Sequence, residues 1–322
     1  MIRPRVTHEW GRLREVIVGR PHYRLPDPMP EDGRAQVSER TWRRACRFAG
    51  KTLAEAMPAD FARCREQMDH LVGLLRAHDI GVHRVPPFLP REEDYLREQA
   101  RESILLFPRD PLLVVGGRVI ELTMRDVHRR RERFPLRRLL RRVLASTARV
   151  EAMPEPDPPE RCDEADPFLD GGDCLLTGDT LYVGAATGDS TEAGVDWLRR
   201  TLGSRRKVEA VPYDGDFPHL DCTLCLIRPG LGLFCPDAIP EGPPASLAGW
   251  RWLEVSRDEA ISGMATNGIQ LDANTLVLAD GADPVAARLR ALGLTIHTVP
   301  FDAITNLGGG PRCWSQPLVR WG

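Results

Sequence analysis

The sequence lacks any long apolar run and any excess of one charge. No stretch of about 18 consecutive apolar residues occurs, and the first ten residues, MIRPRVTHEW, contain neither an apolar core nor a cleavage signal. The formal net charge is -2, so composition gives no overall argument for a nucleic-acid or membrane partner. Only two lysines occur, Lys51 and Lys207, so nearly all positive charge is arginine. We therefore expect a soluble, cytoplasmic protein.

Cysteines are present but give no sign of a disulfide framework. A chain of 322 residues can bury a core without disulfides. Its eight cysteines are at positions 46, 64, 162, 174, 222, 225, 235 and 313, and most of them lie in apolar runs. Cys222 and Cys225 have the spacing of half a zinc site, but no second ligand pair follows. We predict that both lie in one strand, where they point to opposite faces and pack in the core. Neither a metal nor a cofactor is predicted.

A repeated design of two strands and a helix runs through the chain. Four stretches read as hairpins, each an apolar strand, a tight turn and a second apolar strand: 112–122, 174–184, 224–234 and 269–279. Helices are predicted near 126–144, 190–202 and 284–292, the last with Asp283 as N-cap. The strand 15–19 is a fifth, diverged member. Since such a repeat must pack against its neighbours, we expect one α/β domain over 1–322, with the repeats in a closed ring.

The arginine-rich segment 125–142 raises the question of RNA binding. Its apolar positions instead suit an amphipathic helix with a solvated arginine face, and no aromatic platform accompanies it. We therefore predict no nucleic-acid partner.

Residues able to do chemistry stand at the edges of the predicted hairpins. They are Asp110 before the first, Asp170 and Asp173 before the second, His219 and Asp221 before the third, and Cys313 after three glycines at 308–310. Singly, such residues are most often caps, turn residues or core groups. In a ring of repeats, however, equivalent edges face one central opening. We therefore expect these side chains to converge.

Five motifs, in this order, resemble those of the amidinotransferase family: EWGRLREVIVGRP, PRDPLLVVGGRVIE, FLDGGD, HLDCTLCLIRPG and GGGPRCW. That family includes glycine amidinotransferase and the inosamine-phosphate amidinotransferases, and more distantly arginine deiminases and dimethylarginine hydrolases. The resemblance runs from about residue 8 to the C-terminus. It implies a five-bladed pseudosymmetric α/β propeller, in which ββαβ repeats surround a central channel.

The resemblance also implies a role for each residue. Asp110 and Asp221 would hold the guanidinium of the donor, because carboxylates accept paired hydrogen bonds in its plane. Cys313 would attack the amidino carbon, and His219 would act first as general acid and then as general base. Asp170 would orient and charge-stabilise the imidazole.

The chain also departs from the family pattern. Arg312 stands where most members have a histidine before the nucleophile, and it could activate the thiol or bind an anionic substrate group. Ala238 stands where glycine amidinotransferases hold a substrate carboxylate with arginine, so glycine is a poor candidate acceptor. Asp173 is interpreted as structural, or as an alternative partner for His219.

These observations favour an enzyme that moves an amidino group from arginine, or a similar guanidino donor, to an amine of a secondary metabolite. Two alternatives stay open: an amidinohydrolase or deiminase that uses the same Cys/His/Asp machinery, and a non-catalytic binding protein on the same scaffold. The sequence identifies neither the acceptor nor the oligomeric state, for which a homodimer is one possibility.

Overall fold

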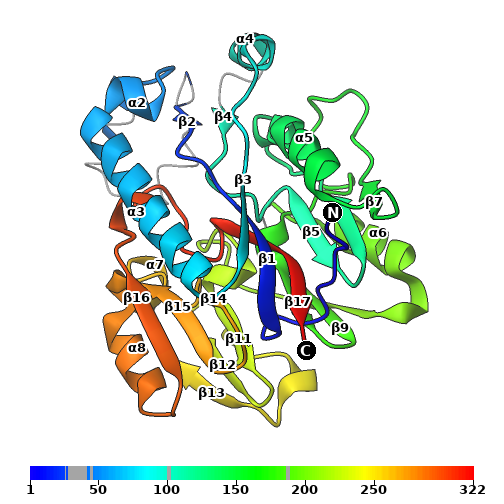
Figure 1. The fold of residues 1–322 in the computed structure, drawn as a ribbon. Coiled ribbons are helices and arrows are strands. Elements are labelled where there is room, and N and C mark those ends of the chain that lie inside the picture. Colours follow the sequence, from blue (N-terminus) through cyan, green and yellow to red (C-terminus); the bar gives the residue numbers. More distant parts are fainter. Residues whose placement is uncertain (26, 28–41, 44–45, 100–102, 186–188) are drawn as a thin grey trace.

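A computed structural model describes residues 1–25, 27, 42–43, 46–99, 103–185 and 189–322. The described chain forms an α/β structure with five three-stranded sheets (Figure 1). The sheets contain β17 (Ser315–Trp321), β1 (Arg12–Val18) and β3 (Gly81–Arg84); β5 (Leu112–Val115), β6 (Arg118–Glu121) and β7 (Arg149–Ala152); β8 (Cys174–Thr177), β9 (Thr180–Gly184) and β10 (Lys207–Val211); β11 (Leu224–Arg228), β12 (Leu231–Phe234) and β13 (Arg251–Glu254); and β14 (Ile269–Gln270), β15 (Thr275–Ala279) and β16 (Thr295–Val299).

All five sheets have the same internal pairing. A middle strand pairs antiparallel with one neighbour and parallel with the other. In four sheets the antiparallel pair is one of the predicted hairpins, and in the fifth it joins β1 to β17, the first and last long strands of the chain. A further two-stranded sheet joins β2 (Tyr23–Arg24) to β4 (Ser103–Ile104). The repeat expected from the sequence is therefore confirmed.

Glycine occupies positions of positive φ in several of the hairpin turns. Gly116 and Gly230 have φ of 59° and 81°, a region in which side chains are strained, and a Cβ at either position would meet nothing within 4 Å. Their strands are buried along nearly their whole length, as expected for strands covered on both faces.

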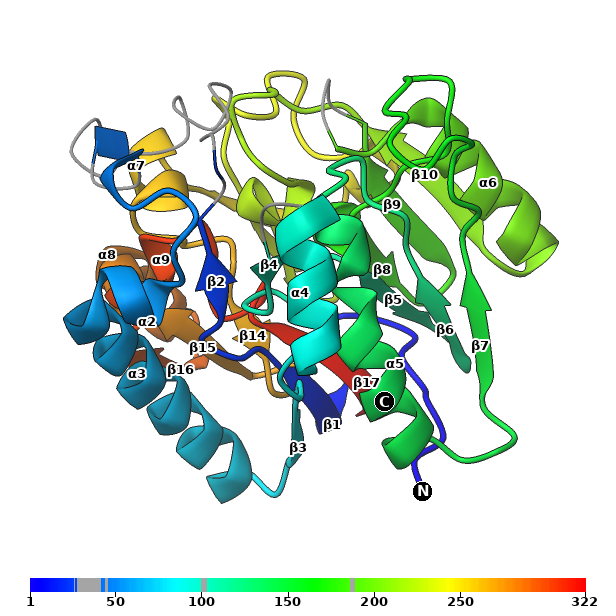
Figure 2. The ribbon, with the colours of Figure 1, turned by 90° about the horizontal axis from the view of Figure 1, so that it is seen from above.

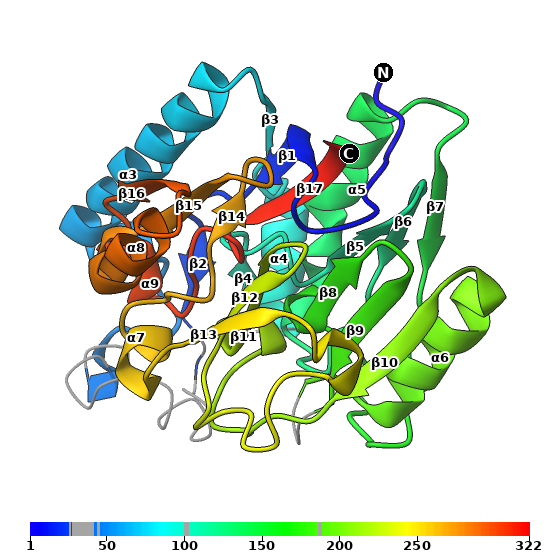
Figure 3. The same cartoon turned by 90° about the horizontal axis from the view of Figure 1, so that it is seen from below.

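Four sheets carry a helix between the two strands that pair in parallel, and these helices lie at the periphery of the molecule (Figures 1 and 3). They are α3 (Pro58–Ala77), α5 (Arg133–Val143), α6 (Glu192–Leu202) and α8 (Asp283–Arg290). Each packs its apolar side chains against its own sheet. Figure 2 shows α6 beside the sheet of β8, β9 and β10, and Val195 and Leu198 of α6 share a core cluster with Leu181 and Val183 of β9. The repeat between β12 and β13 has only the 3-10 turn η6 (Ala245–Leu247).

The remaining helices are short connections. They are α2 (Leu53–Ala56), α4 (Pro90–Gln99), α7 (Arg257–Ile261) and α9 (Asp302–Thr305), and the 3-10 turns η2 (Arg129–Arg131), η3 (Gly171–Asp173), η4 (Gly203–Arg205), η5 (Leu220–Cys222) and η7 (Asp280–Ala282). Among the described helices, none is long and apolar enough to cross a membrane.

Several local predictions were wrong in detail. Asp283 is the first residue of α8, and Ala282 is its N-cap. Cys222 lies in η5 and not in the strand that holds Cys225, because β11 begins only at Leu224. The mix of proline, arginine and acidic residues over 21–58 also predicts a surface connection, and residues 26, 28–41 and 44–45 of it lie outside the described residues.

The arginine-rich segment is less exposed than predicted. Arg130 and Arg133 are buried, and the Arg130 guanidinium lies 4.8 Å from the centre of the Phe168 ring. Several of its other arginines form ion pairs with carboxylates, as Arg137 does with Glu121. The segment is thus largely tied into the protein, and its arginines do not form a free basic face.

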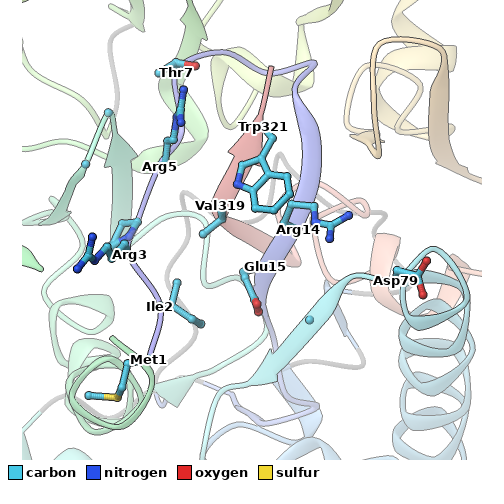
Figure 4. A pocket seen from close by; sticks show the side chains of 14 residues that line it. Met1, Ile2, Arg3, Arg5, Thr7, Arg14, Glu15, Asp79, Val319 and Trp321 are labelled. Atoms are coloured by element: carbon cyan, nitrogen blue, oxygen red, sulfur yellow. The ribbon is translucent and has the colours of Figure 1, made fainter. Parts of the chain in front are cut away.

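An open hollow of about 880 Å³ lies beside the N-terminal segment and the outer ends of β1 and β17 (Figure 4). Trp321 and Arg14 lie side by side there, with the guanidinium 4.5 Å from the ring centre. None of the residues predicted to do chemistry lines this hollow.

Candidate active site

The structure brings together five of the six side chains that the sequence singled out: Asp110, Asp170, His219, Asp221 and Cys313. His219 Nε2 lies 3.3 Å from Asp170 Oδ2, and His219 Nδ1 lies 3.8 Å from Asp110 Oδ1. Cys313 Sγ lies 3.8 Å from each carboxylate oxygen of Asp221. All five are at most 6% exposed. Convergence at one buried site is therefore confirmed, although the residues span more than two hundred positions of the chain.

Each of these residues sits in an irregular turn beside a strand. Asp110 precedes β5, Asp170 precedes η3 and β8, and His219 precedes η5 and β11. Cys313 lies in a turn that ends where β17 begins. The strands fix the ends of these turns, and the turns place the side chains between the sheets.

Asn267, which sequence reasoning missed, holds the turn of Cys313. Its Oδ1 accepts hydrogen bonds from the backbone N–H groups of Gly310 and Cys313, at 3.2 and 3.0 Å. Its Nδ2 donates to Cys313 Sγ at 3.1 Å. One amide therefore fixes the backbone of the turn and supplies a hydrogen bond to the sulfur.

The surroundings of Cys313 and His219 favour a thiolate beside an imidazolium. A hydrogen bond with Cys222 lowers the pKa of Cys313, and a hydrogen bond with His219 lowers it further. Burial and the charge of Asp221 raise this pKa, but the net shift is downward. Burial lowers the pKa of His219, but Asp110 and hydrogen bonds with Asp170 and Cys313 outweigh burial and raise it well above its usual value. Burial also raises the pKa of Asp170 to about 7.

Asp173 faces away from this pair and is bonded to the scaffold. Its carboxylate accepts hydrogen bonds from the hydroxyls of Ser190 at 2.6 Å and Tyr213 at 2.9 Å, and from the backbone N–H of Leu220 at 2.8 Å. Since Leu220 follows His219, Asp173 anchors the backbone beside the imidazole. This arrangement fits the structural interpretation.

Arg312 lies behind Asp221 and is buried. Its Nε donates to Asp221 Oδ2 at 3.2 Å, one terminal nitrogen donates to the Cys174 carbonyl at 2.9 Å, and the guanidinium forms an ion pair with Glu9. Burial alone would raise the pKa of Glu9, but Arg312 and Arg109 hold it at about 2. All three nitrogens of Arg312 are thus bonded within the protein. A substrate-binding role for Arg312 would require breaking these bonds, whereas a role in holding Asp221 requires none.

Arg129 is a second residue that sequence reasoning missed. Its guanidinium lies 3.0 Å from Asp110 Oδ2, 3.8 Å from Asp170 Oδ2 and 2.8 Å from Glu132 Oε1. A planar cation of the protein itself therefore lies against two of the predicted site carboxylates. The only signal in the sequence was its place among the arginines that we assigned to a solvated face.

Two buried carboxylate oxygens of the site, Asp110 Oδ1 and Asp170 Oδ1, have no hydrogen-bond partner among the residues that the structure describes. Because an unpaired buried polar atom is costly, such atoms indicate where a polar ligand binds. Two groups also offer donor atoms within 4.8 Å of one another, which is close enough for a metal ion: Asp221, Cys222 and Cys313, and Asp170, Asp189 and His219.

Gly172 gives a first test of how closely His219 must be placed. A Cβ at Gly172 would lie 2.5 Å from His219 Nδ1, so we expect Gly172→Ala to displace the imidazole. A shift of about 1 Å at a reacting group can lower a rate by about 100-fold. We expect a loss of that order in turnover with little change in thermal stability, measured by differential scanning calorimetry. Gly249→Ala is the control because Gly249 is exposed, has no positive φ, and a Cβ there would meet nothing within 4 Å.

The chain is similar to known proteins over nearly its full length, although no family model matches it. It is 24% identical to the mitochondrial glycine amidinotransferase of Gallus gallus, an alignment that covers 98% of this chain and 82% of the relative. It is 28% identical to a putative inosamine-phosphate amidinotransferase 2 of Streptomyces griseus, covering 95% and 93%. Among solved structures, SxtG, an amidinotransferase of the saxitoxin pathway of Microseira wollei, has a TM-score of 0.81 at 20% identity and covers 100% of this chain and 98% of that one. The chain is thus similar to amidinotransferases along almost all of its length and has the fold of the solved SxtG structure.

Proposed function

We propose that this protein is an amidinotransferase, which moves an amidino group from arginine or a similar guanidino donor to an amine through an amidino group bound to Cys313. The observation that carries the proposal is the pairing of a thiol with a cationic imidazole inside a ring of carboxylates. Such a site can hold a flat cation and present a nucleophile to its carbon. The amidinotransferase names of its relatives support the same reaction class.

The carboxylates account for donor binding. Asp110 lies beside His219 and Asp221 lies beside Cys313, and Asp110 Oδ1 has no hydrogen-bond partner among the described residues. A guanidinium between them would donate in-plane hydrogen bonds to both. Asp110 already pairs with one guanidinium, that of Arg129, at 3.0 Å. This contact supports the proposal that the same buried carboxylate binds the guanidinium of a donor.

The first half of the reaction transfers the amidino group to sulfur. The Cys313 thiolate attacks the amidino carbon, and the bond from that carbon to the departing nitrogen breaks. His219, held cationic by Asp110 and Asp170, gives its proton to the departing amine. The nearby carboxylates balance the charge of the amidino group that stays on the sulfur.

The second half reverses these roles. The acceptor amine takes the place of the departed one, and neutral His219 removes a proton as the amine nitrogen attacks the amidino carbon. The carbon–sulfur bond breaks and the thiolate returns. Asp170 stabilises the imidazolium that forms again, from 3.3 Å.

The acceptor is proposed to be an amine of a secondary metabolite. Ala238, at the position where glycine amidinotransferases have an arginine for a carboxylate, is fully buried in the core. Arg312 is bonded to Glu9 and Asp221. Glycine, which would need a cationic partner for its carboxylate, is therefore disfavoured.

The finer features of the architecture are also proposals. We place the five sheets as blades of a pseudosymmetric propeller within one domain over 1–322, because they share one pairing pattern and β1 pairs with β17. A homodimer and a cytoplasmic location remain predictions.

Separating the half-reactions tests the proposed function. With labelled arginine alone, a transferase should release at most one ornithine per site and leave an added mass of about 42 Da on the peptide of Cys313. Continued ornithine release should require an amine, for example hydroxylamine as a small probe. Steady formation of citrulline or urea without an amine would instead assign a deiminase or amidinohydrolase. No adduct with any guanidino donor would support a non-catalytic protein.

A further inference from the structure

A second thiol lies beside the predicted nucleophile, and the proposed reaction does not use it. Cys222 is the last residue of η5 and is 2% exposed. Asn267 Nδ2 lies 3.7 Å from Cys222 Sγ and 3.1 Å from Cys313 Sγ, so both sulfurs contact the same amide nitrogen. The two sulfurs lie within 4.8 Å of each other and of an Asp221 carboxylate oxygen. Forming an S–S bond of about 2.05 Å would require them to approach by less than about 3 Å.

The two sulfurs differ in ways that suit thiol oxidation. Hydrogen bonds with Cys222 and His219 lower the pKa of Cys313, and the hydrogen bond with Cys313, burial and Asp221 raise the pKa of Cys222. Cys313 therefore carries the reactive thiolate and Cys222 keeps its proton. Cys222 Sγ also lies 3.5 Å from Asp221 Oδ1, a carboxylate positioned to take that proton.

We propose that Cys222 and Cys313 form a reversible disulfide when the enzyme meets a peroxide, so that Cys222 resolves the oxidised nucleophile and protects it from irreversible oxidation. In the first step the Cys313 sulfur attacks one peroxide oxygen, the O–O bond breaks and hydroxide leaves, which gives a sulfenic acid on Cys313. In the second step Cys222 loses its proton to Asp221, and its sulfur attacks the sulfenic sulfur. The S–O bond breaks and the hydroxyl leaves as water with a proton from solvent. The two thiols together lose two electrons and two protons, and hydrogen peroxide is reduced to water.

The consequence for activity rests on the proposed function, because a disulfide at Cys313 removes the nucleophile of amidino transfer. The bond itself does not depend on that function and can be measured without a substrate. A failure of the disulfide and a failure of the transfer reaction are therefore distinguishable.

The test is to treat the full chain with a small excess of hydrogen peroxide and to map its cysteines by mass spectrometry. The unmodified enzyme should lose about 2 Da and give a cross-linked Cys222–Cys313 peptide. Dithiothreitol should restore both labelling of Cys313 by iodoacetamide and the turnover seen before peroxide.

Two variants make the result specific. In Cys222→Ala, peroxide should instead add about 32 Da to Cys313, the sulfinic acid, which dithiothreitol does not reverse. In Cys225→Ala, a matched control that removes an equally buried thiol three residues away, the cross-link should form as in the unmodified chain. Sulfinic acid on Cys313 with a free Cys222 in the unmodified enzyme, or a cross-link of Cys313 to another cysteine, would overturn the proposal.

Discussion

Replacing Cys313 by alanine should lower amidino transfer by on the order of 10⁴-fold or more, because the covalent route then has no nucleophile. The sulfur lies 3.8 Å from Asp221, and its surroundings lower its pKa. Water or a hydroxyl cannot replace it, since a guanidinium carbon is a poor electrophile. Donor binding should survive, because Asp110 and Asp221 are unchanged. The expected result is a dead enzyme that still binds arginine.

Two measurements separate this outcome from simple unfolding. Isothermal titration of arginine should give a dissociation constant within a few-fold of the unmodified enzyme, and mass spectrometry should find no adduct of about 42 Da anywhere in the chain. Cys225→Ala is the control, because it removes a buried thiol whose sulfur accepts a hydrogen bond from Gln270. An alanine variant that still transferred labelled amidino carbon would exclude the covalent mechanism.

The strands and their pairing could be predicted from the sequence because they depend on local signals. Apolar runs joined by Gly-Gly, Gly-Asp and Pro-Gly turns predicted three of the hairpins closely. The hairpin over 269–279 was less regular, since β14 has only two residues and Leu271 to Asn274 form the connection. Repetition then predicted convergence of the site residues, because the same edge of each repeat was expected to face the same opening.

Two contacts that sequence reasoning missed join residues that are far apart in the chain. Glu9 meets Arg312 across 303 positions, and Asn267 meets Cys313 across 46. Both lie in irregular segments, where neither an apolar period nor a turn signal marks the residue. Contacts of this kind depend on the tertiary arrangement and leave no local pattern. Cys222 was misjudged for a related reason: the extra turn of η5 before β11 moves it out of the strand and toward Cys313.

Arg312 shows how a departure from a family pattern can be misread without a structure. At the sequence level it was a free cation beside the nucleophile, able to contact either thiol or substrate. In the structure its guanidinium holds Glu9 and Asp221, and Asp221 faces the sulfur. Its effect on Cys313 is therefore transmitted through a carboxylate that it positions, which a permanently charged planar side chain does well when buried.

Replacing His219 by glutamine should lower turnover by about 10²- to 10⁴-fold and should also shift the titration of Cys313. The imidazole supplies the proton for the departing amine, and glutamine cannot. It also supplies a hydrogen bond and a positive charge that lower the pKa of Cys313. Without them the pKa of the thiol rises, so thiolate should appear only at higher pH than in the unmodified enzyme.

The rate of Cys313 alkylation by iodoacetamide, measured against pH, reports this shift directly because only the thiolate reacts. In the unmodified enzyme the rate should fall only when the pH drops below the lowered pKa of the thiol. In His219→Gln the midpoint of the curve should move to higher pH, and added imidazole should restore part of the turnover. His70→Gln is the control, since His70 is exposed on α3. An unchanged alkylation curve in His219→Gln would mean that the imidazole does not act on the sulfur, and the thiolate–imidazolium pair would then have to be abandoned even if turnover fell.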